Sequence, residues 1–447
     1  MTTVRRASDV FSEENSLELY LSIEAALAQV QAEIGLIPRA SADQIRSQAH
    51  LRTLDLGSLR QQTERTGYAV APLVRQLTQA CGDAGHFVHW GATTQDLVNT
   101  ALALQINEVT ESMFGHLQRL ALALVEHVKR HRHTVMAART FGGHALPITF
   151  GFKSAVWLAA VLRHANRLKA LLLSPMQGEF AGAAGTLASL GPDAILVRKK
   201  LMELLGLPEP AVTWASMRDE VFARVSALAG LTNTLAKIAQ DVAELSSTEI
   251  GELCEPNSGA KDTSSTLPYK SNPVLCAQIA AAASLVGQHA VTVLHSGRQR
   301  QERSAEGLLE IQVVGPAFIE ADKCILKSIR LIEGLQVFPQ RMQLNLQATH
   351  GIILAERFMM ALAPRLGRLQ AHDLVHDACR LAVEKNTSLR SVLGQIPQVA
   401  DHLSAQALDD LADPAGYLGI AAATCDRVID SVHEVFDGKQ HHHEPHS

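Results

Sequence analysis

The chain consists of long apolar stretches that are separated by short polar breaks. Apolar residues recur at helical spacing over about 16–34, and Gly35 and Pro38 follow where this pattern stops. Five longer stretches are too apolar to be helices with a single buried face, and they predict long helices over about 96–131, 147–173, 221–253, 274–301 and 308–335. No segment has a convincing strand pattern. We therefore predict an all-α fold.

The distribution of helix breakers divides the chain into parts. Glycines and prolines become frequent after about residue 339, which indicates shorter helices there. We expect an N-terminal small helical domain, a central bundle of the five long helices, a C-terminal small helical domain and a disordered His-rich tail, over residues 1–95, 96–338, 339–437 and 438–447. One chain cannot cover every apolar face of such long helices, so we expect oligomerisation through the bundle.

Composition narrows the class of protein. Hydrophobic residues make up 47% of the chain but aromatic residues only 4%, which suits close-packed helices better than sheets. The net charge of −5, with both signs mixed, argues against a nucleic-acid surface or a polybasic membrane patch. The most apolar run, 274–294, is interrupted by Gln278, Gln288 and His289, so we interpret it as a buried helix and not as a membrane span.

The cysteines and the start of the chain indicate a compartment. The six cysteines are scattered without CxxC spacing, which in a chain of this size is typical of reduced thiols in a cytosolic protein. The first residues, MTTVRRASDVFSEEN, lack the apolar core of a signal peptide. We expect a cytoplasmic protein without a zinc site.

Four polar breaks, 89–96, 139–147, 178–191 and 255–273, lie at the ends of long helices. Ordinary helix capping accounts for polar residues at any one of them. The glycine-rich break at 178–191 lacks the Lys-Ser/Thr ending of a phosphate loop, and no strand precedes it, so we exclude nucleotide binding there. The break at 255–273 is different, because it combines two hydroxyls, a lysine and an asparagine with two prolines that stiffen its end.

This last break resembles the signature of the aspartase/fumarase superfamily. Residues 264–273, SSTLPYKSNP, are similar to Gly-Ser-Ser-x-Met-Pro-x-Lys-x-Asn-Pro, with Thr263 in place of glycine and Leu267 in place of methionine. Residues 88–96 and 139–147 resemble two segments of the adenylosuccinate lyase and 3-carboxy-cis,cis-muconate cycloisomerase branches. The resemblance extends over nearly the whole chain. Residues 181–191, 341–346 and 361–368 are closest to the cycloisomerase branch.

The resemblance implies an assembly and a class of substrate. Members of this superfamily are homotetramers in which the five-helix bundles of four chains form a 20-helix core. Each active site takes segments from three subunits. The reaction needs neither a metal nor an organic cofactor, and the substrate is a small di- or tricarboxylate. No partner of another kind is implied.

The chemistry of the superfamily explains why these residue types occur together. The enzyme removes a proton from the carbon next to a carboxylate and then expels a group from the adjacent carbon. The doubly charged aci-carboxylate intermediate requires cations and fixed dipoles, which Lys270 and Asn272 would supply. The resemblance places the catalytic base at Ser264, although the residues alone do not distinguish it from Ser265.

The resemblance also assigns the other breaks. Substrate binding is implied for a further set of residues: Thr93, Thr94, Gln95, Arg139, Thr140 and Arg303. His89 and His144 match active-site histidines of the adenylosuccinate lyase branch. Considered without the family, the threonines fit a helix cap, the histidines fit structural roles and Arg303 fits a solvated surface position.

Two departures from the family pattern bear on the reaction. Phe141 occupies the position of a catalytic histidine, and Ala277 occupies the position of the glutamate that orients that histidine. The usual proton donor is therefore missing. Either the leaving group is a weakly basic anion such as a carboxylate, or His144 or His89 acts as the acid.

The first possibility favours a reaction like that of 3-carboxy-cis,cis-muconate cycloisomerase, whose lactone-opening direction expels a carboxylate. The alternative is a C–N or C–X lyase that releases fumarate from a substituted aspartate or succinate, as adenylosuccinate lyase does. A third hypothesis, which the missing dyad favours slightly, is a catalytically inactive structural homologue.

Overall fold

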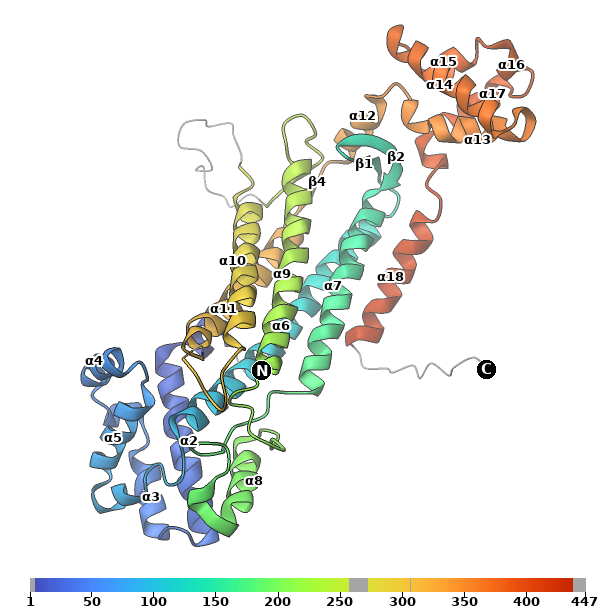
Figure 1. Ribbon diagram of the computed structural model, residues 1–447. Helices are drawn as coiled ribbons and strands as arrows, with labels where there is room; N and C mark the ends of the chain where they lie inside the picture. Colours follow the sequence, from blue (N-terminus) through green and yellow to red (C-terminus); the bar gives the residue numbers. More distant parts are fainter. Residues whose placement is uncertain (1–4, 257–271, 306, 437–447) are drawn as a thin grey trace, which may run out of the picture. The chain divides into compact units, whose positions relative to one another are not determined.

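The computed structural model describes residues 5–256, 272–305 and 307–436 (Figure 1). Nearly all of its regular structure is helical, which confirms the all-α prediction. The five long helices are those expected from the apolar pattern: α6 (Thr94–Arg130), α7 (Phe150–Leu173), α9 (Asp219–Leu245), α10 (Val274–Ser296) and α11 (Gly307–Glu333). α11 continues through Pro316, and α9 ends earlier than expected.

Shorter helices form the rest of the chain. In the first half they are α1 (Ala7–Val10), α2 (Glu13–Ile34), α3 (Arg39–Gln48), α4 (Leu56–Thr66), α5 (Val70–Ala80) and α8 (Ala194–Leu205). After α11 they are α12 (Pro339–Gln347), α13 (Ala355–Leu366), α14 (Arg368–Glu384), α15 (Leu389–Leu393), α16 (Pro397–Ala400), α17 (Ala405–Leu411) and α18 (Ala421–Phe436). Short 3₁₀ helices are Leu51–Thr53, Gly82–Phe87, Ala188–Asp193, Ile352–Leu354 and Pro414–Gly416.

The structure contains strands that the sequence pattern did not predict. β1 (Val135–Thr140) and β2 (Gly143–Thr149) form an antiparallel hairpin, and β3 (Leu253–Cys254) pairs with β4 (Gln336–Val337). The expectation of a helix from residue 147 was therefore wrong by three residues, because Pro147 lies in β2. The hairpin turn consists of Phe141 and Gly142, both with positive φ (50° and 82°), as a two-residue hairpin turn requires.

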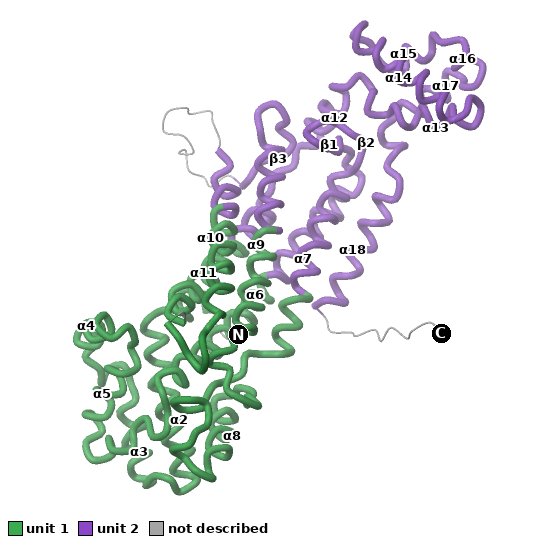
Figure 2. Tube along the Cα trace, in the orientation of Figure 1, with its two compact units in different colours: residues 1–116, 166–233, 281–326 green, residues 117–165, 234–280, 327–447 purple. Residues whose placement is uncertain are grey.

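The chain forms two compact units, which Figure 2 distinguishes by colour. Unit 1 contains residues 1–116, 166–233 and 281–326, and unit 2 contains 117–165, 234–280 and 327–447. Each long helix contributes residues to both units. The division into three helical domains stays a prediction.

Unit 1 has a core between α2, α3 and α5. Leu17 and Leu21 of α2, Ile45 of α3 and Leu73 of α5 are all buried in this core. The hydroxyl of Ser12 accepts a hydrogen bond from the amide of Asn15 at the start of α2.

Unit 2 has a core in its C-terminal helices. α13, α14 and the helices after them bury Phe358, Leu362 and Leu393. Side-chain hydrogen bonds connect the long helices of this unit. His127 Nε2 of α6 lies 2.8 Å from the carbonyl oxygen of Ile332 in α11.

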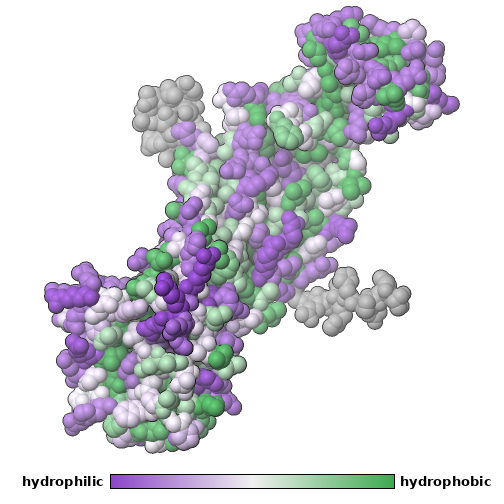
Figure 3. Space-filling model, in the orientation of Figure 1, coloured by the Kyte–Doolittle hydropathy of each residue, from purple (hydrophilic) through white to green (hydrophobic). Residues whose placement is uncertain are grey.

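Large apolar side chains remain exposed on the long helices. Figure 3 shows one face of the molecule, where hydrophobic groups lie among polar ones over these helices. Leu285, Val291 and Leu294 of α10 are each more than two-fifths exposed. Among the described residues, α10 is the one helix whose length and composition would suit a membrane span. Only 28% of an apolar 18-residue stretch of this helix is buried within the chain.

Candidate active site

The two units each hold a different part of the expected site. Unit 1 contains His89, Thr93, Thr94, Gln95 and Arg303, and unit 2 contains Arg139, Thr140, His144 and Asn272. Ser264 and Lys270 lie outside the described residues.

In unit 1, His89 is held by a carboxylate that the sequence analysis did not identify. Glu24 of α2 is 1% exposed. One of its oxygens accepts the backbone N–H of His89 at 3.0 Å, and the other lies 2.5 Å from His89 Nδ1. Burial lowers the pKa of His89, but the hydrogen bond and charge of Glu24, together with the charge of Asp96, outweigh burial, so this pKa is raised. The arrangement therefore favours a protonated imidazole.

A second buried carboxylate, Asp96, fixes the start of α6. Its side chain accepts backbone hydrogen bonds from Thr93 (2.9 Å), Ala181 (2.8 Å) and Gly182 (3.1 Å). Asp96 thus joins the break at 89–96 to the glycine-rich break, where small residues allow close backbone approach. The hydroxyls of Thr93 and Thr94 have no hydrogen-bond partner among the described residues, and both side chains are half-buried.

Gln95 and Arg303 line the same cavity in unit 1. Its volume is about 170 Å³, and α2, α6 and α11 contribute to its walls. Gln95 is half-buried, whereas Arg303 is exposed at the cavity and has no ion-pair partner within the described ranges. The structure therefore brings these two predicted residues together, while His89, Thr93 and Thr94 are not part of this cavity wall.

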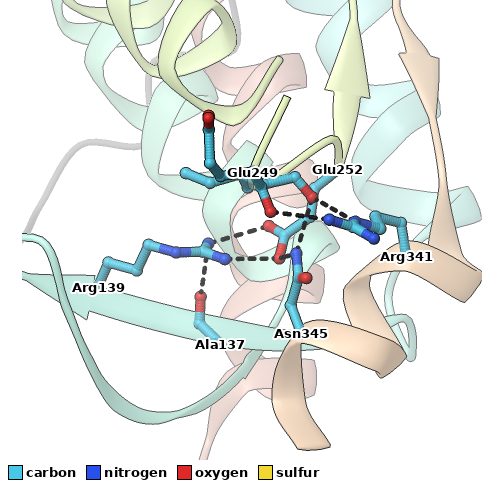
Figure 4. Close-up of polar contacts among 7 residues, drawn as sticks. Ala137, Arg139, Glu249, Glu252, Arg341 and Asn345 are labelled. Atoms are coloured by element: carbon cyan, nitrogen blue, oxygen red, sulfur yellow. Dashed lines mark hydrogen bonds and ion pairs between the residues drawn. The ribbon is translucent and has the colours of Figure 1, made fainter. Parts of the chain in front are cut away.

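In unit 2, Arg139 is bound to a buried carboxylate, as Figure 4 shows. Its Nη1 and Nη2 donate to the two oxygens of Glu252 at 2.9 and 2.7 Å. Asn345 Nδ2 of α12 donates to the same carboxylate at 2.7 Å, and Arg341 donates to the carbonyl oxygens of Glu249 and Ile250. These bonds hold the hairpin, α12 and the segment after α9 together. The guanidinium of Arg139 therefore has a structural partner, and a substrate contact for it stays a prediction.

The other hairpin residues lie close to Arg139 in the ladder. His144 is directly opposite Arg139, and Thr140 is the exposed residue before the turn. Burial and the charge of Arg139 lower the pKa of His144, and its Nδ1 is buried without a partner among the described residues. His144 is therefore neutral at physiological pH. Phe141 is fully exposed at the hairpin tip.

One side chain, that of Glu255, connects the start of the break at 255–273 to the helix that follows it. Glu255 accepts hydrogen bonds from the amides of Leu275 and Cys276, both at 3.2 Å, in the first turn of α10. Asn272 lies two residues before the start of this helix and is half-buried. Within the described residues, no group of three or more His, Cys, Asp or Glu side chains is arranged to hold a metal ion.

The sequence analysis missed Glu24 and Glu252, although one signal was present. Leu17, Leu21, Glu24 and Ala28 follow helical spacing, so Glu24 is a charged residue on the apolar face of α2. A carboxylate at such a position requires a partner. No comparable pattern surrounds Glu252, which lies in the loop that precedes β3.

Comparisons with known proteins identify the family of the chain. A family model described as "Lyase" matches residues 3–287, and one described as "Adenylosuccinate lyase C-terminus" matches residues 351–428. The chain belongs to the aspartase/fumarase superfamily. Its members named here act as lyases or cycloisomerases on small molecules, and the chain is an enzyme of this superfamily.

Individual superfamily members are similar over almost their whole length. The 3-carboxy-cis,cis-muconate cycloisomerase of Pseudomonas aeruginosa is 39% identical over 95% of this chain and 94% of its own. Trans-aconitate decarboxylase 1 of Mycosarcoma maydis is 39% identical over 94% of this chain and 86% of its own.

Two solved structures support the same fold. A fumarate lyase from Mesorhizobium sp. BNC1 has a TM-score of 0.89 and 41% identity, and covers 95% of this chain and 97% of its own. The 3-carboxy-cis,cis-muconate lactonizing enzyme from Pseudomonas putida has a TM-score of 0.91 and 34% identity, and covers 96% of this chain and 97% of its own.

Proposed function

We propose that the enzyme catalyses cofactor-independent β-elimination and addition on a di- or tricarboxylate, with a reaction like that of 3-carboxy-cis,cis-muconate cycloisomerase. In the lactone-opening direction, the alkoxide of Ser264 takes the proton from the carbon next to a carboxylate. Lys270 and Asn272 bind the resulting aci-carboxylate. The ring C–O bond then breaks, its electron pair stays on oxygen, and the new carboxylate is the leaving group.

The observation that carries this proposal is the loss of the family-type proton donor, because a departing carboxylate needs little help from an acid. The family-type proton donor is absent, since Phe141 and Ala277 replace its two members. Of the two candidate substitutes, His144 is neutral because its pKa is lowered, whereas the pKa of His89 is raised. A protonated imidazole can stabilise a departing carboxylate or donate a proton to it, so His89 is the better candidate for the acid.

The remaining predicted residues would bind the other negative charges of the substrate. Thr93 and Thr94 have hydroxyls without partners among the described residues, and they lie at the N-terminus of α6, where backbone amides favour an anion. Gln95 and Arg303 line the cavity of unit 1. Arg139 and Thr140 are assigned to the same role from the family resemblance.

We propose that the active enzyme is a homotetramer whose active sites combine residues from three subunits. The exposed apolar side chains of α10 support this assembly, because an uncovered helix of this composition is stable in water only when another surface covers it. Sedimentation analysis of the full chain would measure the number of subunits. A monomer at micromolar concentration would contradict the proposal.

The second candidate function is a lyase that releases fumarate from a substituted aspartate or succinate. The match of residues 351–428 to the adenylosuccinate lyase C-terminus and the solved fumarate lyase favour it. The two functions differ in their products. A cycloisomerase-like reaction in the lactonising direction lowers the absorbance of the muconate, whereas a lyase raises the absorbance of fumarate.

One spectroscopic assay tests both candidates. The purified enzyme is supplied with 3-carboxy-cis,cis-muconate, with succinyl adducts of amines and thiols, and with trans-aconitate. Trans-aconitate is included because the relative from Mycosarcoma maydis is named as a trans-aconitate decarboxylase. Ser264→Ala should abolish turnover of the accepted substrate without changing the assembly. Ser265→Ala is the matched control and should retain most of the activity.

Two results of this assay would contradict the proposed reaction. Full activity in Ser264→Ala would show that the base is another residue. Absence of turnover with every substrate of the panel would support the third hypothesis, a catalytically inactive homologue.

A further inference from the structure

The cavity of unit 1 contains a polar group that the residues around it do not satisfy. Asn99 of α6 lines this cavity and is completely buried. Its Nδ2 has no hydrogen-bond acceptor among the described residues. A buried amide donor without a partner costs free energy, so its presence indicates an acceptor that is not among the described residues, such as a bound ligand.

The orientation of the Asn99 amide is fixed by its neighbours. Its Oδ1 accepts from Gln95 Nε2 at 2.6 Å and from Arg218 Nη1 at 3.2 Å. Arg218 can only donate, so a flipped Asn99 amide would place its NH₂ group against the guanidinium, whereas the Gln95 amide could turn with it. Nδ2 is therefore held as a donor.

A buried ion pair supports this arrangement from behind. Arg218 Nε donates to the two oxygens of Glu310 at 3.1 and 2.9 Å, and both residues are 4% exposed. Because Glu310 neutralises Arg218, the side chain of Arg218 can position Asn99 without leaving a buried charge uncompensated. The network is therefore rigid before any ligand binds.

The charge of the cavity indicates the class of ligand. Its described lining contains two arginines, Arg218 and Arg303, and a single carboxylate, Glu310. Since Arg218 and Glu310 form a pair, Arg303 contributes an unpaired positive charge. Gln299 also lines the cavity, and its buried Oε1 has no partner, so its amide can turn to present a donor. One unpaired cation and two available amides fit a carboxylate group.

We propose that Asn99 is the specificity-determining donor of a carboxylate subsite in this cavity. The subsite binds the additional carboxylate that distinguishes a tricarboxylate substrate from a dicarboxylate. Arg303 supplies the charge, and Gln95 is the residue that connects the subsite to the start of α6. This inference rests on the proposed function, because that function assigns the other carboxylates to other residues.

The test uses two ligands that differ by one carboxylate. Tricarballylate is glutarate with an additional carboxylate on its central carbon, and neither can undergo the elimination. Their dissociation constants are measured by titration calorimetry with the full chain. The wild type should bind tricarballylate at least about tenfold more tightly than glutarate, as expected for a hydrogen bond to a charged group.

The decisive variant is Asn99→Asp, which retains the acceptor for Gln95 and Arg218 but replaces the donor by an anionic oxygen. It should bind tricarballylate at least about tenfold more weakly than the wild type, with little change for glutarate. Asn99→Ala removes the donor without adding charge, and it decides the test if Asn99→Asp does not fold. Asn233→Asp adds the same charge at an exposed position of α9 and should bind both ligands as the wild type does.

Two outcomes would overturn the subsite: equal binding of the two ligands by the wild type, or unchanged tricarballylate binding in the folded Asn99 variants. The turnover assay on the same preparations separates this result from the proposed reaction. If the enzyme turns over a substrate but the Asn99 variants bind tricarballylate as the wild type does, the subsite is wrong and the proposed reaction stands. If the Asn99 variants bind tricarballylate more weakly but no substrate is turned over, the proposed reaction is wrong and the subsite stands.

Discussion

The ion pair between Arg139 and Glu252 separates a structural role from a role in substrate binding. The family resemblance assigns Arg139 to the substrate, whereas the structure binds its guanidinium to a carboxylate with no exposed side-chain surface. Replacement of Arg139 by methionine removes two of the three donors that the described structure provides to Glu252 and leaves only Asn345.

The expected cost of this change is large. Removal of one partner leaves an uncompensated buried charge, which typically costs about 3–5 kcal/mol. For a compact unit of about 200 residues, each kcal/mol lowers Tm by about 2–4 °C, so Arg139→Met should unfold about 10 °C below the wild type. The double variant Arg139→Met/Glu252→Met exchanges the pair for apolar side chains and should recover most of the loss.

Thermal unfolding followed by circular dichroism measures these effects, with all variants at one protein concentration because assembly contributes to Tm. Unchanged Tm in Arg139→Met, or additive losses in the double variant, would refute the structural role. Turnover of the double variant then tests the second role. A folded but inactive double variant would show that this pair has a role in the reaction besides its structural one.

Two further predictions concern protonation. Burial, together with the charges of His127 and Arg130, lowers the pKa of His131 to about 4. The pKa of a histidine in the unfolded chain is about 6.5, so between about pH 6.5 and 4 the unfolded chain binds a proton that the folded chain does not bind. The free energy of unfolding should therefore fall by about 3 kcal/mol as the pH is lowered through this range. Urea unfolding at a series of pH values measures this change. Glu24→Gln removes the charge that raises the pKa of His89, so the decline of kcat at high pH should move to lower pH. An unmoved pH profile would exclude His89 as the acid.

The sequence predicted the helical parts of the fold well, because apolar periodicity is a local property. The start of α2, α6 and α10 and the glycine stop after α2 follow from residues within a few positions. The hairpin was missed because the first of its two turn residues with positive φ is Phe141, which is not a turn-forming residue type. Its strands are also short, and three of their 13 residues are alanine.

The chemistry of the site divides in the same way. The order of residues in 88–96, 139–147 and 264–273 was sufficient to recognise the superfamily and to select the candidate residues. Their partners were not recognisable. Glu24 is 65 positions from His89, and Glu252 is 113 positions from Arg139. No local pattern connects residues at such separations, and the pKa of a histidine depends on these neighbours.

The sequence alone therefore determined the helical class, the family and the set of candidate side chains for the reaction, since these depend on residue type and local spacing. The tertiary structure decided which histidine has a raised pKa, which arginine is bound to a carboxylate and where Asn99 presents its free donor. Burial and long-range pairing set these properties, and both arise only when distant segments pack together.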